Sequence, residues 1–220
     1  MDLDLAADAL IAAGRRLGAR GLISAGEGNL SSRLDAERLL VTPSGRRKDE
    51  LDRDDLVVVR LGHLVSEARS RSGLQPSSDI ASHLAIHAAR PELGAIAHAH
   101  LPALLGLTLA GEVPDPRALP ETALFLARLP FLTYGVMGSL ELAERVAAAL
   151  SAPPEPFANA VLLERHGAVA VGPDPATAVN RLELVEVLCR TWRDALLIRA
   201  ARGHDGIVVE PDPALREEER

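Results

Sequence analysis

The sequence predicts an α/β fold, with helices packed over the faces of a mixed or antiparallel sheet. Segments with apolar residues at helical spacing alternate with short runs rich in Val, Leu, Ile and Ala, which are typical of strands. Three expected strands, at residues 29–33, 38–42 and 55–61, follow one another without a helix between them. Consecutive strands favour antiparallel pairing. No Gly-x-Gly-x-x-Gly motif joins an early strand to a helix, which argues against a dinucleotide-binding fold.

The first expected helix covers residues 3–19, where apolar side chains recur at helical spacing and glycines mark its end. A second helix is expected over residues 80–89, because Ser77-Ser78-Asp79 resembles a helix start and Arg90-Pro91 a stop. Further helices are expected at residues 102–110, 121–128, 140–150 and 175–199, and further strands at residues 94–100, 129–134, 160–164 and 168–171.

The composition is that of a globular chain with one large domain. Of its 220 residues, 47% are hydrophobic and 25% are charged, a typical balance for such proteins. Aromatic residues make up only 2%, so Ala, Leu, Val and Ile must build the core. We expect a single domain over residues 1–200 and a charged, flexible tail over residues 201–220.

Charge and sequence patterns also limit the expected location and partners. No apolar run reaches the roughly 18 residues of a transmembrane helix, and the acidic N-terminus does not resemble a secretory signal. The single cysteine, Cys189, cannot form an internal disulfide, which favours a reducing, cytoplasmic location. A net charge of −7 argues against nucleic acid as a partner, although it allows an anionic small molecule.

His98 and His100 lie two residues apart in the expected strand at residues 94–100. Alternate residues of a strand project from one face, so both imidazoles should point into the same space. Imidazole is a common metal ligand, and two on a rigid strand make half of a tetrahedral site. Two hydrogen-bonded core histidines would give the same pattern, so the pair by itself leaves both interpretations open.

His166 and Asp79 are the residues that would complete such a site. His166 precedes Gly167 at the corner between two expected strands, and is either a third ligand or a turn histidine bonded to nearby carbonyl groups. Asp79 is either an acid facing the positive end of a helix or an oxygen ligand and general base. The remaining histidines are interpreted as structural or exposed: His63, His83, His87 and His204.

Small hydroxyl and amide groups gather in three segments: Gly28-Asn29-Leu30-Ser31, Thr42-Pro43-Ser44-Gly45 and Ser77-Ser78. Each segment by itself is ordinary turn chemistry. Together, with the two serines at a helix N-terminus, they would cradle a phosphate group through N–H and O–H donors.

Five motifs occur in a fixed order: Gly28-Asn29-Leu30-Ser31-x-Arg33, Thr42-Pro43-Ser44-Gly45, Pro76-Ser77-Ser78-Asp79 with His83, Ala97-His98-Ala99-His100 and Arg165-His166-Gly167. In these motifs and their order the sequence resembles the class II aldolase/adducin family over roughly residues 5–195. The resemblance implies a three-layer α/β/α fold around a central, mainly antiparallel sheet. It also implies a homotetramer with active sites at subunit boundaries.

The resemblance assigns roles position by position. His98, His100 and His166 match the zinc ligands of the family, and Asp79 matches an acidic position that serves as ligand or base. Five residues fall on positions that contact the substrate phosphate: Asn29, Ser44, Gly45, Ser77 and Ser78.

Two departures from the family patterns bear on the reaction. Asp79 stands where the fuculose-phosphate aldolase pattern has Glu, and its carboxylate reaches about 1.5 Å less far, which favours steady ligation over movement. The aldolase and epimerase patterns also use a late tyrosine, whereas the only tyrosine here is Tyr134. The family places its second acid–base group near Glu121, which is otherwise a plain acid at a helix N-terminus.

The resemblance therefore predicts a zinc-dependent lyase of the aldolase type. It would cleave a small ketose phosphate, similar to L-fuculose 1-phosphate, to dihydroxyacetone phosphate and an aldehyde through a zinc-stabilised enediolate. Asp79 would be a ligand or base and Glu121 a proton donor, with another divalent metal as an alternative to zinc. A sugar-phosphate 4-epimerase, a dehydratase and a non-catalytic, adducin-like assembly module remain open alternatives.

Overall fold

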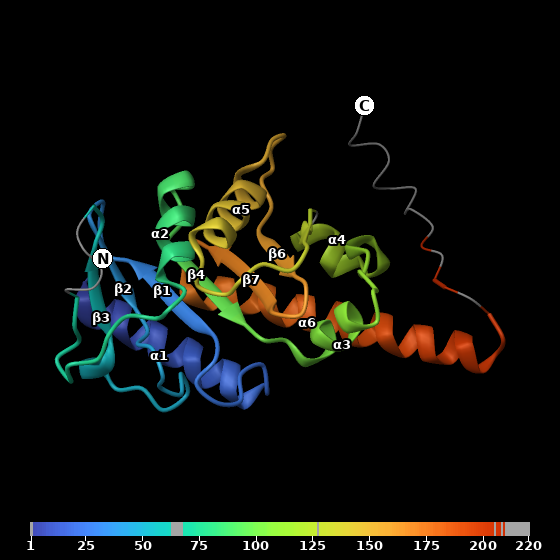
Figure 1. Cartoon of the computed structure of the whole chain (residues 1–220), viewed down its shortest axis with the longest axis horizontal. Coiled ribbons are helices and arrows are strands. Elements are labelled where there is room, and N and C mark those ends of the chain that lie inside the picture. The colour runs from blue at the N-terminus through green and yellow to red at the C-terminus, as the bar shows by residue number, and fades with distance from the viewer. Residues whose placement is uncertain (1, 63–67, 127, 205, 208, 210–220) are drawn as a thin grey trace.

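The computed structural model describes residues 2–62, 68–126, 128–204, 206, 207 and 209 (Figure 1). The described α-helices are α1 (Leu3–Ala19), α2 (Ile80–Ala89), α3 (Pro102–Leu109), α4 (Pro120–Leu126), α5 (Leu140–Ser151) and α6 (Pro175–Ala201). The described strands are β1 (Asn29–Arg33), β2 (Arg38–Val41), β3 (Val57–Arg60), β4 (Ala95–Ala99), β5 (Phe131–Leu132), β6 (Ala160–Leu163) and β7 (Gly167–Gly172).

The strands form one seven-stranded sheet in the order β3-β2-β1-β4-β7-β6-β5. Every neighbouring pair is antiparallel except β5 and β6, which run parallel. The mainly antiparallel sheet that the sequence predicts is therefore confirmed.

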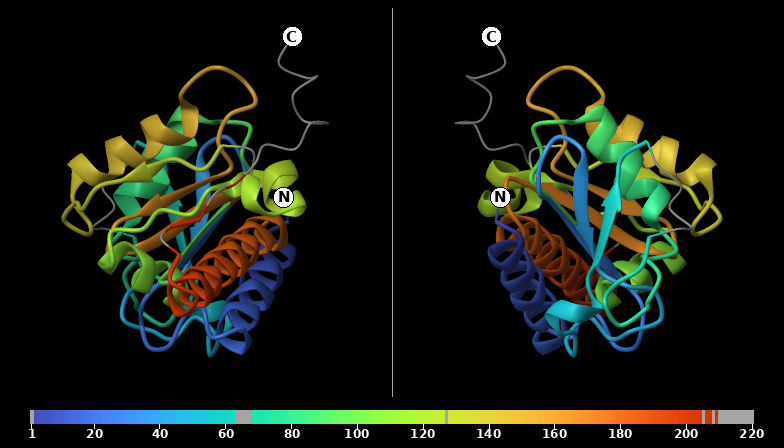
Figure 2. Two further views of the ribbon diagram at one scale, coloured as in Figure 1. Left: turned by 90° about the vertical axis from the view of Figure 1, so that its right-hand side faces the viewer. Right: turned by 90° about the vertical axis from the view of Figure 1, so that its left-hand side faces the viewer.

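Helices cover both faces of the sheet and make three layers (Figure 2). On one face α1 and α6 lie side by side, and α3 and α4 pack against α6. On the other face α2 packs against α5. Alternate residues of β4 divide between two apolar cores, since Ala97 and Ala99 join the core under α6 whereas Ile96 joins the core under α5. The three-layer α/β/α fold is confirmed.

Several elements differ in extent from the sequence prediction, and the largest differences include β3, which covers Val57–Arg60 where residues 55–61 were expected. Strand β5 covers only Phe131–Leu132, because it lies at the sheet edge and pairs with β6 alone. Strand β4 ends at Ala99, so His100 lies just beyond it. The chain leaves the sheet there because Pro102 begins α3, and the carboxylate of Glu186 on α6 accepts a hydrogen bond from Ala103 N–H in the first turn.

Parts of the sequence prediction fall outside the described residues. These are His63 and most of the tail at residues 201–220. The division into one domain and a tail stays a prediction. Among the described helices, none combines the length and apolar character that crossing a bilayer requires.

Gly167 allows β7 to lie against the end of β4. Its backbone has φ +142°, and a Cβ atom there would lie 2.2 Å from Ala99 O. Only glycine tolerates both this torsion angle and this contact. Because Gly167 has no side chain, the backbone there can approach β4, and the preceding residue His166 lies close to His100.

Replacing Gly167 with Ala should destabilise the protein by roughly 2–4 kcal/mol, through backbone strain and overlap with β4. Gly106→Ala is the matched control, because this exposed glycine lies in α3 and a Cβ atom there would meet no side chain or other segment of the described residues within 4 Å. The control should gain about 0.5–1 kcal/mol from helix propensity. Urea denaturation measures both, and a Gly167→Ala protein as stable as the control would contradict the packing argument.

Candidate metal centre

Three central strands bring the candidate ligands to one end of the sheet. Antiparallel neighbours set the start of one strand against the end of the next, so Asn29 at the start of β1 lies opposite His98 near the end of β4. On its other side His98 lies opposite Val169 of β7, three residues after the β6–β7 turn. His166 occupies that turn, and His100 follows the end of β4.

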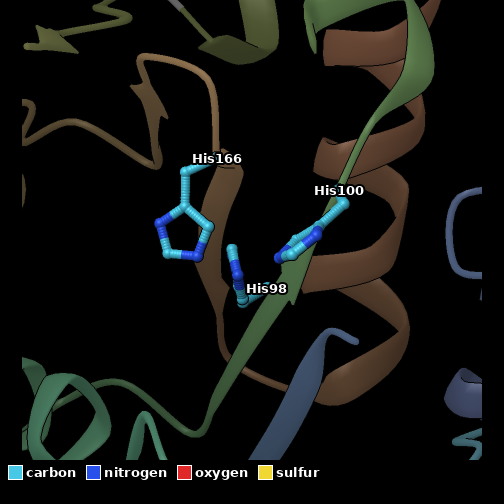
Figure 3. A group of neighbouring side chains, drawn as sticks. All are labelled: His98, His100 and His166. Carbon is cyan, nitrogen blue, oxygen red and sulfur yellow. The ribbon is translucent and has the colours of Figure 1, made fainter. Parts of the chain in front are cut away.

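His98, His100 and His166 form a compact group. Each offers one imidazole nitrogen, and these nitrogens all lie within 4.8 Å of one another. The ring centroids are 4.8–5.1 Å apart and the rings meet at steep angles rather than stacking. Figure 3 shows the three side chains converging on a common space. The prediction that these histidines meet is confirmed.

Unpartnered nitrogens fit a metal at the centre of this group. Nδ1 of His98 lies 3.0 Å from Ala168 O and must donate its proton to that carbonyl group. Nε2 of His98 is therefore a bare acceptor, and it is buried with no hydrogen-bond partner among the described residues, as is Nδ1 of His166. A backbone carbonyl that sets the tautomer of a ligand is a recurring feature of histidine metal sites.

The electrostatic environment keeps the three histidines in the neutral form that binds metals. Burial, and then the neighbouring His166 and His100, hold the pKa of His98 well below 6.5. Burial and His166 lower the pKa of His100, and burial lowers the pKa of His166 although the Asp79 carboxylate opposes that shift. All three imidazoles are consequently uncharged at neutral pH, with lone pairs free for ligation.

Asp79 lies beside the histidines but outside their compact group of nitrogens. It occupies the N-cap of α2, yet its side chain makes no capping hydrogen bond. Its Oδ2 instead accepts a hydrogen bond from Asn29 Nδ2 at 2.8 Å. Asp79 is thus oriented by strand β1 rather than by its own helix, and its role as a fourth ligand stays a prediction.

The serine- and glycine-containing loops meet beside the histidines. Pro43 and Pro76 form an isolated bridge, flanked by hydrogen bonds from Ser44 N to Gln75 O and from Ser77 N to Thr42 O. This pairing uses the two serine N–H groups and leaves their hydroxyl groups as donors. All five predicted phosphate contacts line one cavity of about 270 Å³ with Asp79, His100 and His166: Asn29, Ser44, Gly45, Ser77 and Ser78.

Lys48 lines the same cavity and was not predicted from the sequence. It is 2% exposed, and its ammonium group donates to the backbone carbonyls of Gly26 and Arg46, the latter at 2.7 Å. Burial lowers its pKa from the ordinary lysine value, although the charges of Glu27 and Asp79 oppose the shift. A lysine among exposed arginines gives no sequence signal of burial.

Glu27 is a second lining residue that the sequence did not indicate. Burial would raise its pKa, but N–H groups of its own loop, among them those of Ser24 and Ala25, outweigh burial and lower it. The carboxylate stays ionised at neutral pH. It adds a negative charge close to His100.

Glu121 lies elsewhere on the surface. It is exposed at the start of α4, in a hollow that it shares with Phe125 and with Val187 and other residues of α6. Within one chain it does not line the cavity beside the histidines.

Buried polar groups continue from Asp79 into the protein behind the cavity. Asn29 Oδ1 lies 2.6 Å from His83 Nε2, and His83 Nδ1 lies 2.7 Å from Ser31 Oγ. His87 Nε2 lies 3.2 Å from the same hydroxyl group. His83 and His87 are each 1% exposed, in agreement with their interpretation as structural residues.

A comparison with protein-family models identifies the chain. Residues 8–193 match the family described as class II aldolase and adducin N-terminal domain. The chain belongs to the class II aldolase and adducin family. The match covers the sheet, both helical layers and every residue of the candidate site, so the family resemblance of the motifs is confirmed.

Curated members of the class II aldolase family resemble the chain over most of its length. Methylthioribulose-1-phosphate dehydratase of Acidiphilium cryptum is 32% identical over 188 residues, or 81% of this chain and 85% of the relative. A 3-oxo-tetronate 4-phosphate decarboxylase of Haemophilus influenzae is 32% identical over 182 residues, or 80% and 81% of the two chains. These family members are enzymes of sugar-phosphate metabolism with different reactions, so membership does not select the fuculose-phosphate cleavage that the motifs favour.

The fold also matches solved class II aldolase structures. The crystal structure of l-fuculose-1-phosphate aldolase from Thermus thermophilus superposes with a TM-score of 0.76 at 27% identity. The alignment covers 91% of this chain and 97% of that one. A divalent metal is typical of class II aldolases, and the histidine group of this chain suits one.

The free energy of unfolding of the metal-free protein should fall as the pH is lowered from 6.5 to about 4. Burial lowers the pKa of His83 from 6.5 to about 4, and burial together with Arg33 lowers that of His87 from 6.5 to about 3. Above pH 6.5 both histidines are neutral in the folded and unfolded states, so stability is complete there. Below pH 6.5 these histidines bind protons in the unfolded state but stay neutral in the folded state. By pH 4 this difference lowers the free energy of unfolding by roughly 3 kcal/mol for each histidine.

Urea denaturation at several pH values measures this loss. His87→Leu should flatten the dependence, because the substituted chain has one fewer buried imidazole to protonate. An unfolding free energy that stays constant over this range in the wild type would contradict the burial of neutral histidines.

Proposed function

We propose that the chain is a divalent-metal-dependent lyase that cleaves a small ketose phosphate. The leading reaction is retro-aldol cleavage of an L-fuculose-1-phosphate-like ketose to dihydroxyacetone phosphate and an aldehyde. One observation carries the proposal: a compact group of three neutral histidines, two of which have unpartnered buried nitrogens, lies beside the cavity that the serine- and glycine-containing loops line, and His100 and His166 open onto it. A metal-binding and a phosphate-binding surface within one cavity suit a phosphorylated substrate whose carbonyl and hydroxyl oxygens reach the metal.

His98, His100 and His166 would hold the metal, with Asp79 as the fourth ligand, and zinc is the ion that this donor set favours. When bound, the ion supplies a Lewis acid that stabilises negative charge on substrate oxygens during bond cleavage. Manganese, cobalt and nickel are alternatives, since a set of three imidazoles and a carboxylate accepts several divalent ions.

Asp79 would also take part in proton transfer. Its Oδ2 accepts a hydrogen bond from Asn29, so Oδ1 is the oxygen that is available to bind the metal or to accept a proton. The short side chain suits a stationary group, which supports a role as a ligand or a local base.

The phosphate group would lie against Ser44, Ser77 and Ser78, whose hydroxyl groups line the cavity with Gly45 and Asn29. Lys48 would supply the counter-charge. A dianion entering this cavity meets the carboxylates of Glu27 and Asp79, and Lys48 is the lysine among the cavity residues that offsets them. A charge-assisted hydrogen bond to phosphate contributes about 1.5–3 kcal/mol.

Glu121 is proposed as the second acid–base group, acting as proton donor. Because it lies outside the cavity of its own chain, this role requires a neighbouring copy to bring it to the histidines. The homotetramer with sites at subunit boundaries, implied by the family resemblance, would meet that requirement. Cytoplasmic location is proposed with it, from the chemistry of small phosphorylated metabolites.

Dehydration is the second candidate reaction. It is favoured by the 32% identity to a methylthioribulose-1-phosphate dehydratase and by the single tyrosine of the chain, Tyr134. Epimerisation at C4 of a pentulose phosphate uses the same retro-aldol logic and stays an alternative. A non-catalytic, adducin-like module is opposed by the histidine group, because an assembly surface has no need of three converging imidazoles.

Replacing His98 with Ala should abolish both metal binding and turnover. Wild type should carry about one equivalent of metal per chain and should cleave or dehydrate at least one ketose phosphate in a panel. Elemental analysis and aldehyde release measure the two. His204→Ala is the matched control, because this histidine is exposed and lies after α6. Unchanged metal content and activity in His98→Ala would overturn the proposal.

Replacing Lys48 with Met should weaken phosphate recognition. We expect KM for the best ketose phosphate, and the inhibition constant of inorganic phosphate, to rise about tenfold or more, with a smaller change in kcat. Arg46→Met is the control, since it removes an exposed cation from the same loop. Equal phosphate inhibition of both variants would exclude Lys48 from the phosphate site.

A further inference from the structure

We propose that His83 is a positioning residue, which acts through Asn29 to hold Asp79 in one orientation. The inference rests on the proposed function, in which Asp79 serves the metal site. It depends on a hydrogen-bonded chain of five side chains that runs from the cavity into the core: Asp79, Asn29, His83, Ser31 and His87.

The direction of the first two hydrogen bonds follows from the groups involved. A carboxylate only accepts, so the group 2.8 Å from Asp79 Oδ2 must be the amide nitrogen of Asn29. The amide oxygen of Asn29 then lies 2.6 Å from His83 Nε2. A carbonyl oxygen also only accepts, and His83 must therefore carry its proton on Nε2.

The protonation state of His83 then determines the direction of the remaining hydrogen bonds, which involve Ser31 and His87. Burial lowers the pKa of His83 to about 4, so at neutral pH the ring is uncharged and Nδ1 has no proton. Nδ1 must accept the Ser31 hydroxyl proton, across 2.7 Å. The oxygen of Ser31 in turn accepts from His87 Nε2 at 3.2 Å.

In each of these four hydrogen bonds the donor therefore lies on the side away from Asp79 and donates toward it. The inner end is the buried ring of His87, whose Nδ1 makes no hydrogen bond of good geometry to the described residues, although the Leu93 backbone lies close enough to affect the pKa of this histidine. Chained hydrogen bonds of one direction polarise each other, and this chain ends on a carboxylate that benefits from the effect. A chain that served packing alone would not need one direction, because apolar side chains of similar volume would fill the same space.

These hydrogen bonds fix the orientation of the Asn29 amide group and, through it, of the Asp79 carboxylate. With its oxygen tied to His83, Asn29 presents the NH₂ group to Asp79 and to the cavity it lines. If the amide were reversed, its oxygen would face the carboxylate and repel it. His83 therefore decides which end of Asn29 meets Asp79, although His83 itself lies behind the cavity.

The tautomer of His83 is measured directly in the metal-free wild-type protein, by nuclear magnetic resonance correlation of histidine ring nitrogens with ring protons. We expect His83 to be protonated at Nε2 and bare at Nδ1, with His87 in the same form. This readout needs neither metal nor substrate. A His83 protonated at Nδ1 would overturn the inference even if the enzyme were active.

Variants test the consequence for Asp79. His83→Leu should lower zinc affinity about tenfold or more, as loss of a group that orients a ligand does. His87→Leu is the matched control: it removes an equally buried imidazole one turn later on α2, but Ser31 still donates to His83. The control should retain the zinc affinity of wild type within about twofold, and His83→Gln, which keeps a donor toward Asn29, should recover part of the loss.

The outcomes separate this inference from the proposed function. Equal loss of zinc affinity in His83→Leu and His87→Leu would reduce His83 to a packing role and overturn the inference alone. A wild-type protein that binds no divalent metal would overturn the proposed function together with this role of Asp79. If His83→Leu does not fold, the wild-type tautomer still decides.

Discussion

The pairing of β1, β4 and β7 is the constraint on which the site depends. Their antiparallel register places His98 between Asn29 and Val169. The ends of these central strands and the β6–β7 turn therefore lie together at one end of the sheet. Close approach at that end needs glycine on both sides of β4: a Cβ at Gly28 would lie 2.8 Å from His98 O, and one at Gly167 2.2 Å from Ala99 O. The grouping of the three histidines thus depends first on how closely the backbones pack.

The candidate metal centre also encloses several buried histidines without a large loss of stability. Histidines behind and within the site stay neutral because burial lowers the pKa of each, so no unpaired positive charge is enclosed. Neutral imidazoles are also the form that ligates metals and the form whose tautomer a neighbour can select. The stability of the fold and the proposed metal binding therefore require the same neutral form, from His98 in the histidine group to His87 in the core.

Much of the fold and most of the site could be predicted because their signals are local. Helices α1 and α2 agree with their predicted bounds, and α5 begins at Leu140 as predicted, where the Ser139 side chain accepts a hydrogen bond from Leu142 N–H. Most residues that line the cavity belong to the five sequence motifs, although Glu27 and Lys48 do not. Edge strand β5 and the end of β4 were less predictable, because pairing partners and the start of the next helix decide where a strand stops.

The sequence by itself determined the chemistry available here: imidazole, carboxylate and hydroxyl groups at spacings that suit a metal and a phosphate. Tertiary structure decided where that chemistry acts. It buried Lys48 beside the cavity and left Glu121 in a separate hollow on α4 and α6. It also gave the hydrogen bonds behind Asp79 one direction. The reason is physical, since burial and hydrogen-bond direction depend on neighbours that are distant in the chain and meet only when the sheet forms.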